Sequence, residues 1–309
     1  MSKKDSTVAA VRAPKHVRLR MAALERTSPQ RAAAVGEVMW FQVPDPPKER
    51  KLGKYTPSGG EPFFLLSGDA EITGYTFGPE HAPVALLVHG WGGYWQLLQA
   101  HIGTLLERGY RVVAFDAPSH GHSTHGAEGF GMASVEEMAD AVNAVLDEMG
   151  EPALVLAHGR GAMAVLRARR ARRMPGAFVL FAPEVSIEPA LHWFAKVTGM
   201  GPRTRELFLQ RAQRRLGSDL AEFDLRRDVQ RMAQAGWIPP MLVVHDEDDP
   251  HNPLEQSREL HESWHGSELM VTANQGHRKV IWHDAVVERV AAFVAGLPPA
   301  RPAVRRMPG

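Results

Sequence analysis

Six short apolar runs, separated by segments of helical length, restrict the fold of this chain more than any other feature of its sequence. The runs are VALLVH (84–89), RVVAFD (111–116), ALVLA (153–157), AFVLFA (177–182), PMLVVH (240–245) and ELMVT (268–272). Strands that are buried on both faces of a parallel sheet have such continuous apolar sequences. Because amphipathic segments such as 97–109 and 134–150 separate the runs, we predict an α/β fold, with a mostly parallel central sheet and helices on both faces.

Two local patterns refine this prediction. The alternation over 63–77 favours a β-hairpin that turns at Ser67, Gly68 and Asp69. Ser134 and Glu137 have the spacing of a capping box, so we expect a helix to begin immediately after Ser134.

The remaining segments divide the chain into a core and several additions. We predict that the basic residues 1–20 are disordered, and that 21–58 form a helical arm followed by a proline-rich connector. The core covers 59–183 and 238–296. Residues 184–237 contain amphipathic segments and no strand pattern, which predicts a helical insertion in the position of a lid. The proline-rich residues 297–309 are expected to be disordered.

The composition excludes several kinds of site and partner. The 309 residues contain no cysteine, which excludes disulfides, thiolate metal sites and a cysteine nucleophile. The 36 Lys and Arg residues nearly balance the 35 Asp and Glu residues, so the surface as a whole is not suited to a polyanion. No apolar stretch reaches the roughly 18 residues of a membrane span. We therefore expect a cytoplasmic protein with no membrane span, no nucleic-acid partner, no cofactor and no metal.

Five motifs occur in an order that resembles one family. They are HGWGG (89–93), DAPSHGHS (116–123), AHGRGA (157–162), HDEDDPHNP (245–253) and QGHRK (275–279). Together they resemble the α/β-hydrolase superfamily, in its small-lid branch of esterase-like and lipase-like proteins, over about residues 60–295. This resemblance implies an α/β-hydrolase fold with a catalytic site at the carboxyl ends of the strands.

The motif at 157–162 departs from the family at its most important position. The family has a nucleophile elbow, G-x-S-x-G, between a strand and a helix. This chain has Gly159 where the resemblance implies the nucleophilic serine. Glycine has no side chain, so no acyl-enzyme can form there. The neighbouring His158 is interpreted as a packing residue.

The resemblance implies that the other two members of a Ser-His-Asp triad are present. Asp249 matches the triad acid and His277 the general base. Asp248 remains a competitor for the acid role, because Asp246 replaces the usual glycine of this segment. The run of acids from Asp246 to Asp249 is also compatible with a Mg²⁺ or Ca²⁺ site, although the motif order favours the triad.

Other candidate residues would bind the ligand. The resemblance implies that the backbone N–H groups of Trp91 and Arg160 form an oxyanion hole. The side chains of Arg160, Trp91 and Trp193 are candidates for substrate binding. A guanidinium at 160 binds a carboxylate or phosphate, pairs with a nearby acid, or is exposed to solvent. We expect the helical insertion to give an apolar pocket around Trp193, Phe194, Met200, Leu207 and Phe208.

These observations leave several functions open. The first hypothesis is a pseudoenzyme that binds a small ester or an anionic compound such as a carboxylate, without ordinary serine-hydrolase turnover. The second is an enzyme in which His277 and Asp249 activate water or substrate without a covalent step. A third is a carboxylic-ester hydrolase whose serine has been replaced deliberately. Nucleic-acid binding through the basic arm is supported only by charge.

Overall fold

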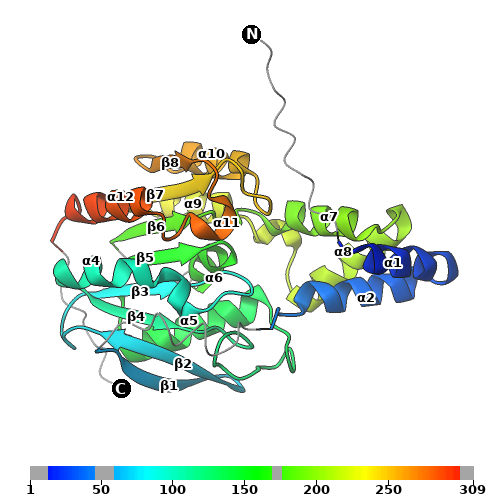
Figure 1. Ribbon diagram of the computed structural model, residues 1–309, viewed down its shortest axis with the longest axis horizontal. Helices are drawn as coiled ribbons and strands as arrows, with labels where there is room; N and C mark the ends of the chain where they lie inside the picture. Colours follow the sequence, from blue (N-terminus) through cyan, green and yellow to red (C-terminus); the bar gives the residue numbers. More distant parts are fainter. Residues whose placement is uncertain (1–12, 46–58, 169–175, 300–309) are drawn as a thin grey trace, which may run out of the picture.

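The computed structural model describes residues 13–45, 59–168 and 176–299, and a single mixed β-sheet lies at its centre (Figure 1). Within these residues the sheet has eight strands, in the order β1-β2-β4-β3-β5-β6-β7-β8. The strands are β1 (Glu61–Ser67), β2 (Ala70–Phe77), β3 (Val84–Val88), β4 (Arg111–Phe115), β5 (Pro152–His158), β6 (Ala177–Phe181), β7 (Met241–Asp246) and β8 (Glu268–Thr272).

The pairing of the strands confirms the predicted sheet. Strands β4, β3, β5, β6, β7 and β8 are parallel to one another. Strands β1 and β2 form an antiparallel hairpin, and β2 also pairs antiparallel with β4. The hairpin closes with Ser67 opposite Ala70, so Gly68 and Asp69 form its turn. Gly68 has φ +56°, a conformation that glycine adopts without steric cost.

Each face of the sheet is covered by helices, as the alternation of β and α segments predicts. Successive side chains of a strand point to opposite faces, and in β3 Ala85 and Leu87 pack into one apolar cluster while Leu86 and Val88 pack into the other. The first cluster includes residues of η2 (Trp95–His101), α4 (Ile102–Glu107) and α12 (Asp284–Ala295). The second includes residues of α5 (Val135–Met149), α6 (Arg160–Ala168), α9 (Leu225–Gln234) and α10 (Leu254–Ser263).

Two expectations about individual elements have clear outcomes. Helix α5 follows Ser134 as predicted, because the Ser134 hydroxyl accepts a hydrogen bond from the Glu137 N–H at 3.2 Å. The expectation of a fully buried strand at 268–272 is wrong. Strand β8 is at the edge of the sheet and pairs only with β7 among the described strands, so Val271 is 39% exposed.

The N-terminal arm consists of two helices, α1 (Lys15–Thr27) and α2 (Pro29–Phe41). The structure differs from the expected boundary, since residues 15–20 are helical rather than part of a disordered terminus. Helix α2 begins where the Ser28 hydroxyl accepts a hydrogen bond from the Arg31 N–H and Pro29 occupies the first turn. The predictions for 1–12, 46–58 and 300–309 lie outside the described residues.

The insertion at 184–237 packs partly on this arm and partly on the core. It contains α7 (Ile187–Thr198), α8 (Pro202–Leu216), η3 (Leu220–Glu222) and α9. Helices α7 and α8 lie together with α1 and α2 at one side of the sheet (Figure 1), and we call these four helices the cap. In contrast, α9 contacts α6 and α10 beside the sheet.

Close packing joins the two halves of the cap. A Cβ atom on Gly36 of α2 would lie 2.2 Å from the Met200 Cε, so the Met200 side chain packs directly against the backbone of α2. Phe208 of α8 is fully buried, and its ring centroid lies 6.5 Å from that of Trp40. Met200 and Phe208 were expected to line a ligand pocket, but they are buried in the interior of the cap.

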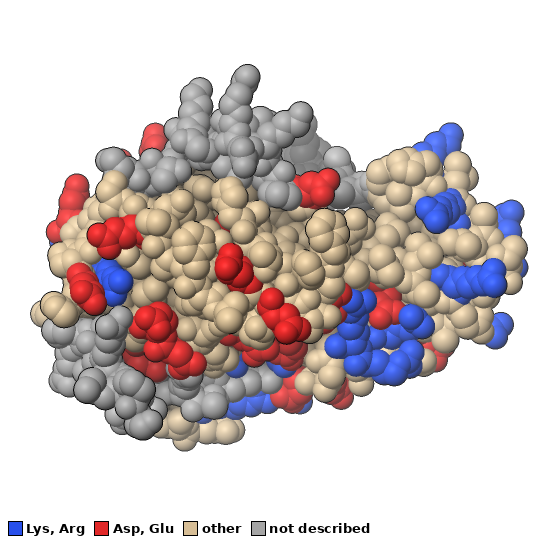
Figure 2. Space-filling model, turned by 90° about the horizontal axis from the view of Figure 1, so that it is seen from below, with Lys and Arg blue, Asp and Glu red and all other residues tan. Residues whose placement is uncertain are grey.

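The cap is also basic. Its two segments, 15–41 and 187–216, contain 11 Lys and Arg residues but only 4 Asp and Glu residues. Figure 2 shows Lys and Arg gathered at the cap and Asp and Glu spread over the core.

In the described part of the chain, no helix is both long and apolar enough to cross a bilayer.

Candidate active site

Gly159 forms the sharp turn between β5 and α6. It has φ +52°, which lies in the left-handed region where side chains cause strain. Its N–H donates to the Phe181 carbonyl at 3.0 Å, and its own carbonyl accepts from the Glu184 N–H at 3.1 Å. The helix passes close to β3, because a Cβ atom on Gly161 would lie 2.4 Å from the His89 carbonyl oxygen. The sequence AHGRGA therefore has the geometry of a nucleophile elbow.

His277 and Asp249 lie together beside this turn. Asp249 follows β7, and His277 lies in α11 (Gly276–Lys279), which follows β8. The distance between His277 Nδ1 and Asp249 Oδ2 is 2.7 Å. The other oxygen of Asp249 accepts from the backbone N–H groups of His251 at 2.8 Å and Asn252 at 3.0 Å. The acid is thus fixed in position and oriented toward the imidazole.

The electrostatics of the pair favour an ionised acid. The Asp249 side chain is fully buried, and burial by itself raises the pKa of a carboxyl group. The hydrogen bond and charge of His277, together with the two backbone N–H groups, outweigh this effect and hold the pKa of Asp249 below its usual value. The His277 side chain is 18% exposed, so the imidazole remains accessible from outside.

The second ring nitrogen of His277 faces the elbow. An ideal Cβ atom built on Gly159 lies 3.4 Å from His277 Nε2 and 3.6 Å from Cε1. Both distances are ordinary van der Waals contacts. A side chain at this position would therefore begin directly beside the nitrogen that Asp249 does not engage.

The neighbouring acids hold the loop that carries His277. Asp246 accepts hydrogen bonds from the Gln275 N–H at 3.1 Å and the Gly276 N–H at 2.8 Å. Asp248 accepts from the Asn274 N–H at 2.9 Å. Asp248, the competitor for the acid role, is therefore bonded to the loop, while Asp249 contacts the imidazole. Within the described residues, no group of three or more His, Asp and Glu side chains is placed to hold a metal ion.

Trp91 and Arg160 present backbone N–H groups near the elbow. Trp91 follows β3 in a tight turn closed by a 2.9 Å hydrogen bond from the Gly93 N–H to the Gly90 carbonyl. Arg160 is the first residue of α6. In the part of the chain that the structure describes, neither N–H donates to another protein group. Two free donors at the start of a helix and in a glycine-rich turn suit a developing oxyanion.

The Arg160 side chain pairs with an acid instead of standing free. Its Nε and Nη2 atoms donate to the two carboxylate oxygens of Glu184, at 2.9 and 3.2 Å, and both side chains are 8% exposed. The guanidinium carbon lies 4.5 Å from the Trp91 ring centroid and 4.7 Å from that of Trp40. Of the alternatives that the sequence left open, the structure thus has the ion pair.

Aromatic and histidine side chains surround His277. The His158 Nε2 lies 3.1 Å from the His277 carbonyl, as expected of a packing residue, and burial holds the pKa of His158 far below its usual value. The His251 ring centroid lies 5.1 Å from that of His277. Trp193 of α7 is half-buried, and its ring centroid lies 6.5 Å from that of His251. The His251 ring therefore neighbours both Trp193 and His277.

Sequence reasoning did not identify Trp40, Glu184 or His251 as members of this cluster. Glu184 has a weak signal, because it is an acid just beyond the carboxyl end of a buried strand. His251 lies inside a motif whose acids attract more attention. Trp40 has no such signal, since it is more than 100 residues from Arg160 in the chain and only the docking of α2 brings them together.

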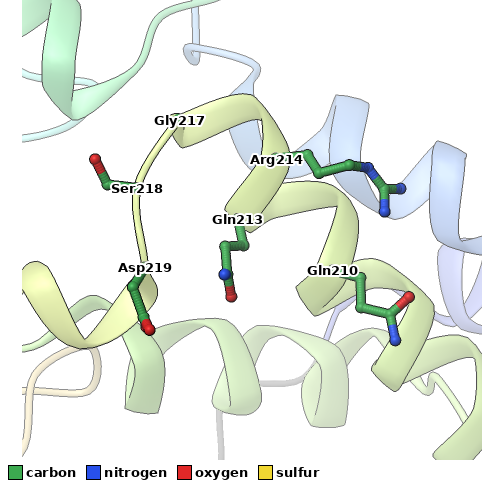
Figure 3. Close-up of a pocket in the computed structure, with 6 residues that line it drawn as sticks. All are labelled: Gln210, Gln213, Arg214, Gly217, Ser218 and Asp219. Atoms are coloured by element: carbon green, nitrogen blue, oxygen red, sulfur yellow. The ribbon is translucent and has the colours of Figure 1, made fainter.

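Two surface hollows lie on the cap, away from these residues. One, of about 550 Å³, is at the carboxyl end of α8 (Figure 3) and is lined by Gln210, Gln213, Arg214, Gly217, Ser218 and Asp219. The other, of about 500 Å³, lies between α1 and α2 and is lined mainly by apolar side chains. None of the predicted site residues lines either hollow.

Comparisons with known proteins agree with this fold. An esterase from Pyrococcus furiosus is 18% identical, with a TM-score of 0.56, over 83% of this chain and 98% of that chain. The Est1E protein of Butyrivibrio proteoclasticus with ferulic acid bound is 17% identical, with a TM-score of 0.55, over 75% of this chain and 96% of that chain. A bromoperoxidase from Bacillus anthracis is 15% identical, with a TM-score of 0.56, over 77% and 100%.

At these identities the structural similarity establishes the fold and nothing about activity. A search of curated protein sequences finds no match. A model of the Alpha/beta hydrolase family matches residues 85–293, a range that includes Gly159, Asp249 and His277. Because that match covers more than half of the chain and the sheet has the corresponding order of elements, this chain belongs to the α/β-hydrolase family.

Proposed function

We propose that this protein is an esterase-like or lipase-like member of its family that binds a small carbonyl compound but lacks serine-hydrolase turnover. The observation that carries the proposal is the relation between Gly159 and His277. The elbow, the acid–histidine pair and two free N–H donors are all present, and the Cβ direction of Gly159 meets His277 Nε2 at 3.4 Å. Only the nucleophilic oxygen is missing.

The loss of that oxygen has a large kinetic consequence. In serine hydrolases the hydroxyl attacks the carbonyl carbon and forms the acyl-enzyme, and the histidine takes its proton. Removing the nucleophile from such a triad costs about 10⁶ in turnover, leaving the effects of binding and the oxyanion hole. Glycine also removes the strain of a left-handed backbone at the elbow, which is worth about 1–3 kcal/mol.

The charges at the site favour a neutral ligand such as an ester over a carboxylate. The N–H groups of Trp91 and Arg160 would hold a carbonyl oxygen by hydrogen bonds. The Arg160 guanidinium is already neutralised by a bidentate bond to Glu184. An anion would have to compete with that carboxylate in a buried site, so it gains little from Arg160.

A second candidate is an enzyme without a covalent step. The pairing of His277 with Asp249 at 2.7 Å and the 18% exposure of the His277 side chain favour it. An imidazole oriented by a carboxylate can take a proton from water while the water attacks a bound carbonyl. A serine removed deliberately from an ordinary ester hydrolase would leave the same arrangement of residues.

Hydrolysis of p-nitrophenyl esters by five chains tests the proposal. These are the protein itself, His277→Ala, Gly159→Ser, Gly159→Ala, and Gly159→Ser with His277→Ala. The alanine variant is the matched control, since it adds the Cβ atom and the backbone strain but no oxygen. We expect turnover only in the Gly159→Ser chain, and we expect it to require His277.

Other outcomes assign the function differently. Activity of the unaltered chain that is lost in His277→Ala would favour activation of water by His277. If the serine variant is inactive toward both short-chain and medium-chain esters while remaining folded, the proposed carbonyl site is wrong.

A further inference from the structure

The geometry points to Trp40 of the N-terminal arm as a specificity-determining residue of the ligand site, where it and the Arg160–Glu184 pair fill the space beside the elbow and restrict the ligand to a short acyl group. This inference rests on the proposed function, because it specifies the class of ester that the site takes. Trp40 lies outside residues 85–293, the part of the chain that matches the family model.

The arm is attached firmly enough to serve as a wall of the site. Glu37 of α2 pairs with Arg211 of α8, and the Gly201 N–H donates to Glu25 of α1 at 2.8 Å. At the end of α2, the Ala133 N–H donates to the Phe41 carbonyl at 3.0 Å, and the Val43 N–H donates to the Gly131 carbonyl at 2.8 Å. Residues on both sides of Trp40 are therefore bonded to other parts of the protein.

Trp40 then reaches the elbow through Arg160. Phe194 of α7 packs edge-on against the Trp40 ring, with the two ring centroids 5.3 Å apart. The Arg160 guanidinium lies 4.7 Å from the Trp40 ring centroid and 4.5 Å from that of Trp91. The guanidinium thus contacts two indole rings, one from the arm and one from the turn that carries a free N–H.

This arrangement fills space that a ligand would otherwise occupy. Arg160 directly follows the nucleophile position, and its side chain is 92% buried by its contacts, with 8% exposed. The buried carboxylate of Glu184 holds the guanidinium in place with two hydrogen bonds. A long acyl chain lying against Arg160 would have to displace a buried ion pair and two aromatic rings, whereas an acetyl or butyryl group would need much less room.

Acyl-chain preference measures this restriction directly. The starting chain is Gly159→Ser, and kcat/KM is measured for p-nitrophenyl acetate, butyrate and octanoate. Trp40→Ala is then added. Phe208→Leu serves as the matched control, since the Phe208 ring neighbours Trp40 inside the cap, whereas Trp40 is the residue whose ring lies against Arg160. We expect Trp40→Ala to raise the ratio of kcat/KM for octanoate to kcat/KM for acetate by about tenfold or more. Accommodating even one additional methylene in an apolar pocket changes kcat/KM by about that factor. Phe208→Leu should leave the ratio nearly unchanged.

A binding measurement on the unaltered Gly159 chain makes the test independent of turnover. Calorimetric titration with ethyl butyrate and ethyl octanoate should show a preference for butyrate, and Trp40→Ala should reverse it. If the serine variant hydrolyses no ester, the proposed hydrolase-like site fails while the titration still decides the role of Trp40. The inference would be overturned by an unchanged acyl-length preference in Trp40→Ala, or by a shift of equal size in Phe208→Leu. It would also be overturned if the unaltered protein and Trp40→Ala bound neither ester.

Discussion

Replacing Arg160 by methionine should destabilise the protein far more than an ordinary loss of a surface charge. Arg160 and Glu184 are each 8% exposed at the side chain and are joined by two hydrogen bonds. Removal of the guanidinium would leave a buried carboxylate without its partner, which costs about 3–5 kcal/mol of unfolding free energy. Methionine has a similar length and can still pack between Trp40 and Trp91, so the loss of packing is small.

The double variant Arg160→Met with Glu184→Met separates the missing charge from the missing contacts. An ion pair replaced by apolar residues of similar volume is often neutral or stabilising, so we expect the double variant to recover most of the loss. The exposed pair of Arg289 and Glu268, whose side chains are 31% and 51% exposed, gives a control. There Arg289→Met should cost at most about 1 kcal/mol.

Urea denaturation followed by circular dichroism at neutral pH measures all three variants. Circular dichroism is preferred because Trp40 and Trp91 are part of the site and would alter the fluorescence. The dependence of Glu184 on Arg160 would be refuted if Arg160→Met lowered the unfolding free energy no more than Arg289→Met does. It would also be refuted if the double variant were as unstable as Arg160→Met alone. Either result would mean that the Glu184 carboxylate does not depend on Arg160.

Three further perturbations have defined outcomes. Gly159→Ala should lower the unfolding free energy by about 1–2 kcal/mol, because φ is +52° at this position; an unchanged urea midpoint would contradict the strain. Burial lowers the pKa of His101 from 6.5 to about 4, despite its hydrogen bond to the Ile281 carbonyl. Because the folded-state pKa is the lower one, stability is fully present above pH 6.5 and falls as the pH decreases toward 4, by an amount on the order of 3 kcal/mol. In His101→Phe this part of the pH dependence should be absent from unfolding curves recorded across that range. Asp246→Ala should cost about 1–3 kcal/mol by leaving the N–H groups of the 275–276 loop unpaired, and it should reduce His277-dependent hydrolysis in the Gly159→Ser chain; retention of both stability and hydrolysis would show that Asp246 does not hold the loop.

The sheet was predictable because its signal is local. Runs such as 84–88 and 177–182 are apolar at every position, a pattern typical of a short strand that is covered on both faces. At 268–272 only the three central residues are apolar, which is still compatible with a short buried strand. The place of β8 at the sheet edge leaves Val271 exposed. Strand order is a property of the whole sheet and not of one strand.

The candidate site was predictable as a set of motifs but not as a set of contacts. The order of Gly159, Asp249 and His277 along the chain indicated which residues meet at the carboxyl ends of the strands. The choice between Asp249 and Asp248 depends on side-chain direction, and two adjacent residues of a loop differ in that respect only once the loop is folded. The side chain of Arg160 had two plausible partners in the sequence, and only the position of Glu184 after β6 distinguishes them.

The sequence by itself determined the α/β core and the sharp strand-to-helix turn at Gly159, because each depends on residue type and on short-range periodicity. The tertiary structure alone decided that Trp40 reaches Arg160 and that the insertion joins the N-terminal helices in one cap. These contacts join residues far apart in the chain, and the burial of side chains such as Phe208 between the helices determines which of them meet. No local pattern encodes such a contact, since its free energy exists only when both partners are already folded.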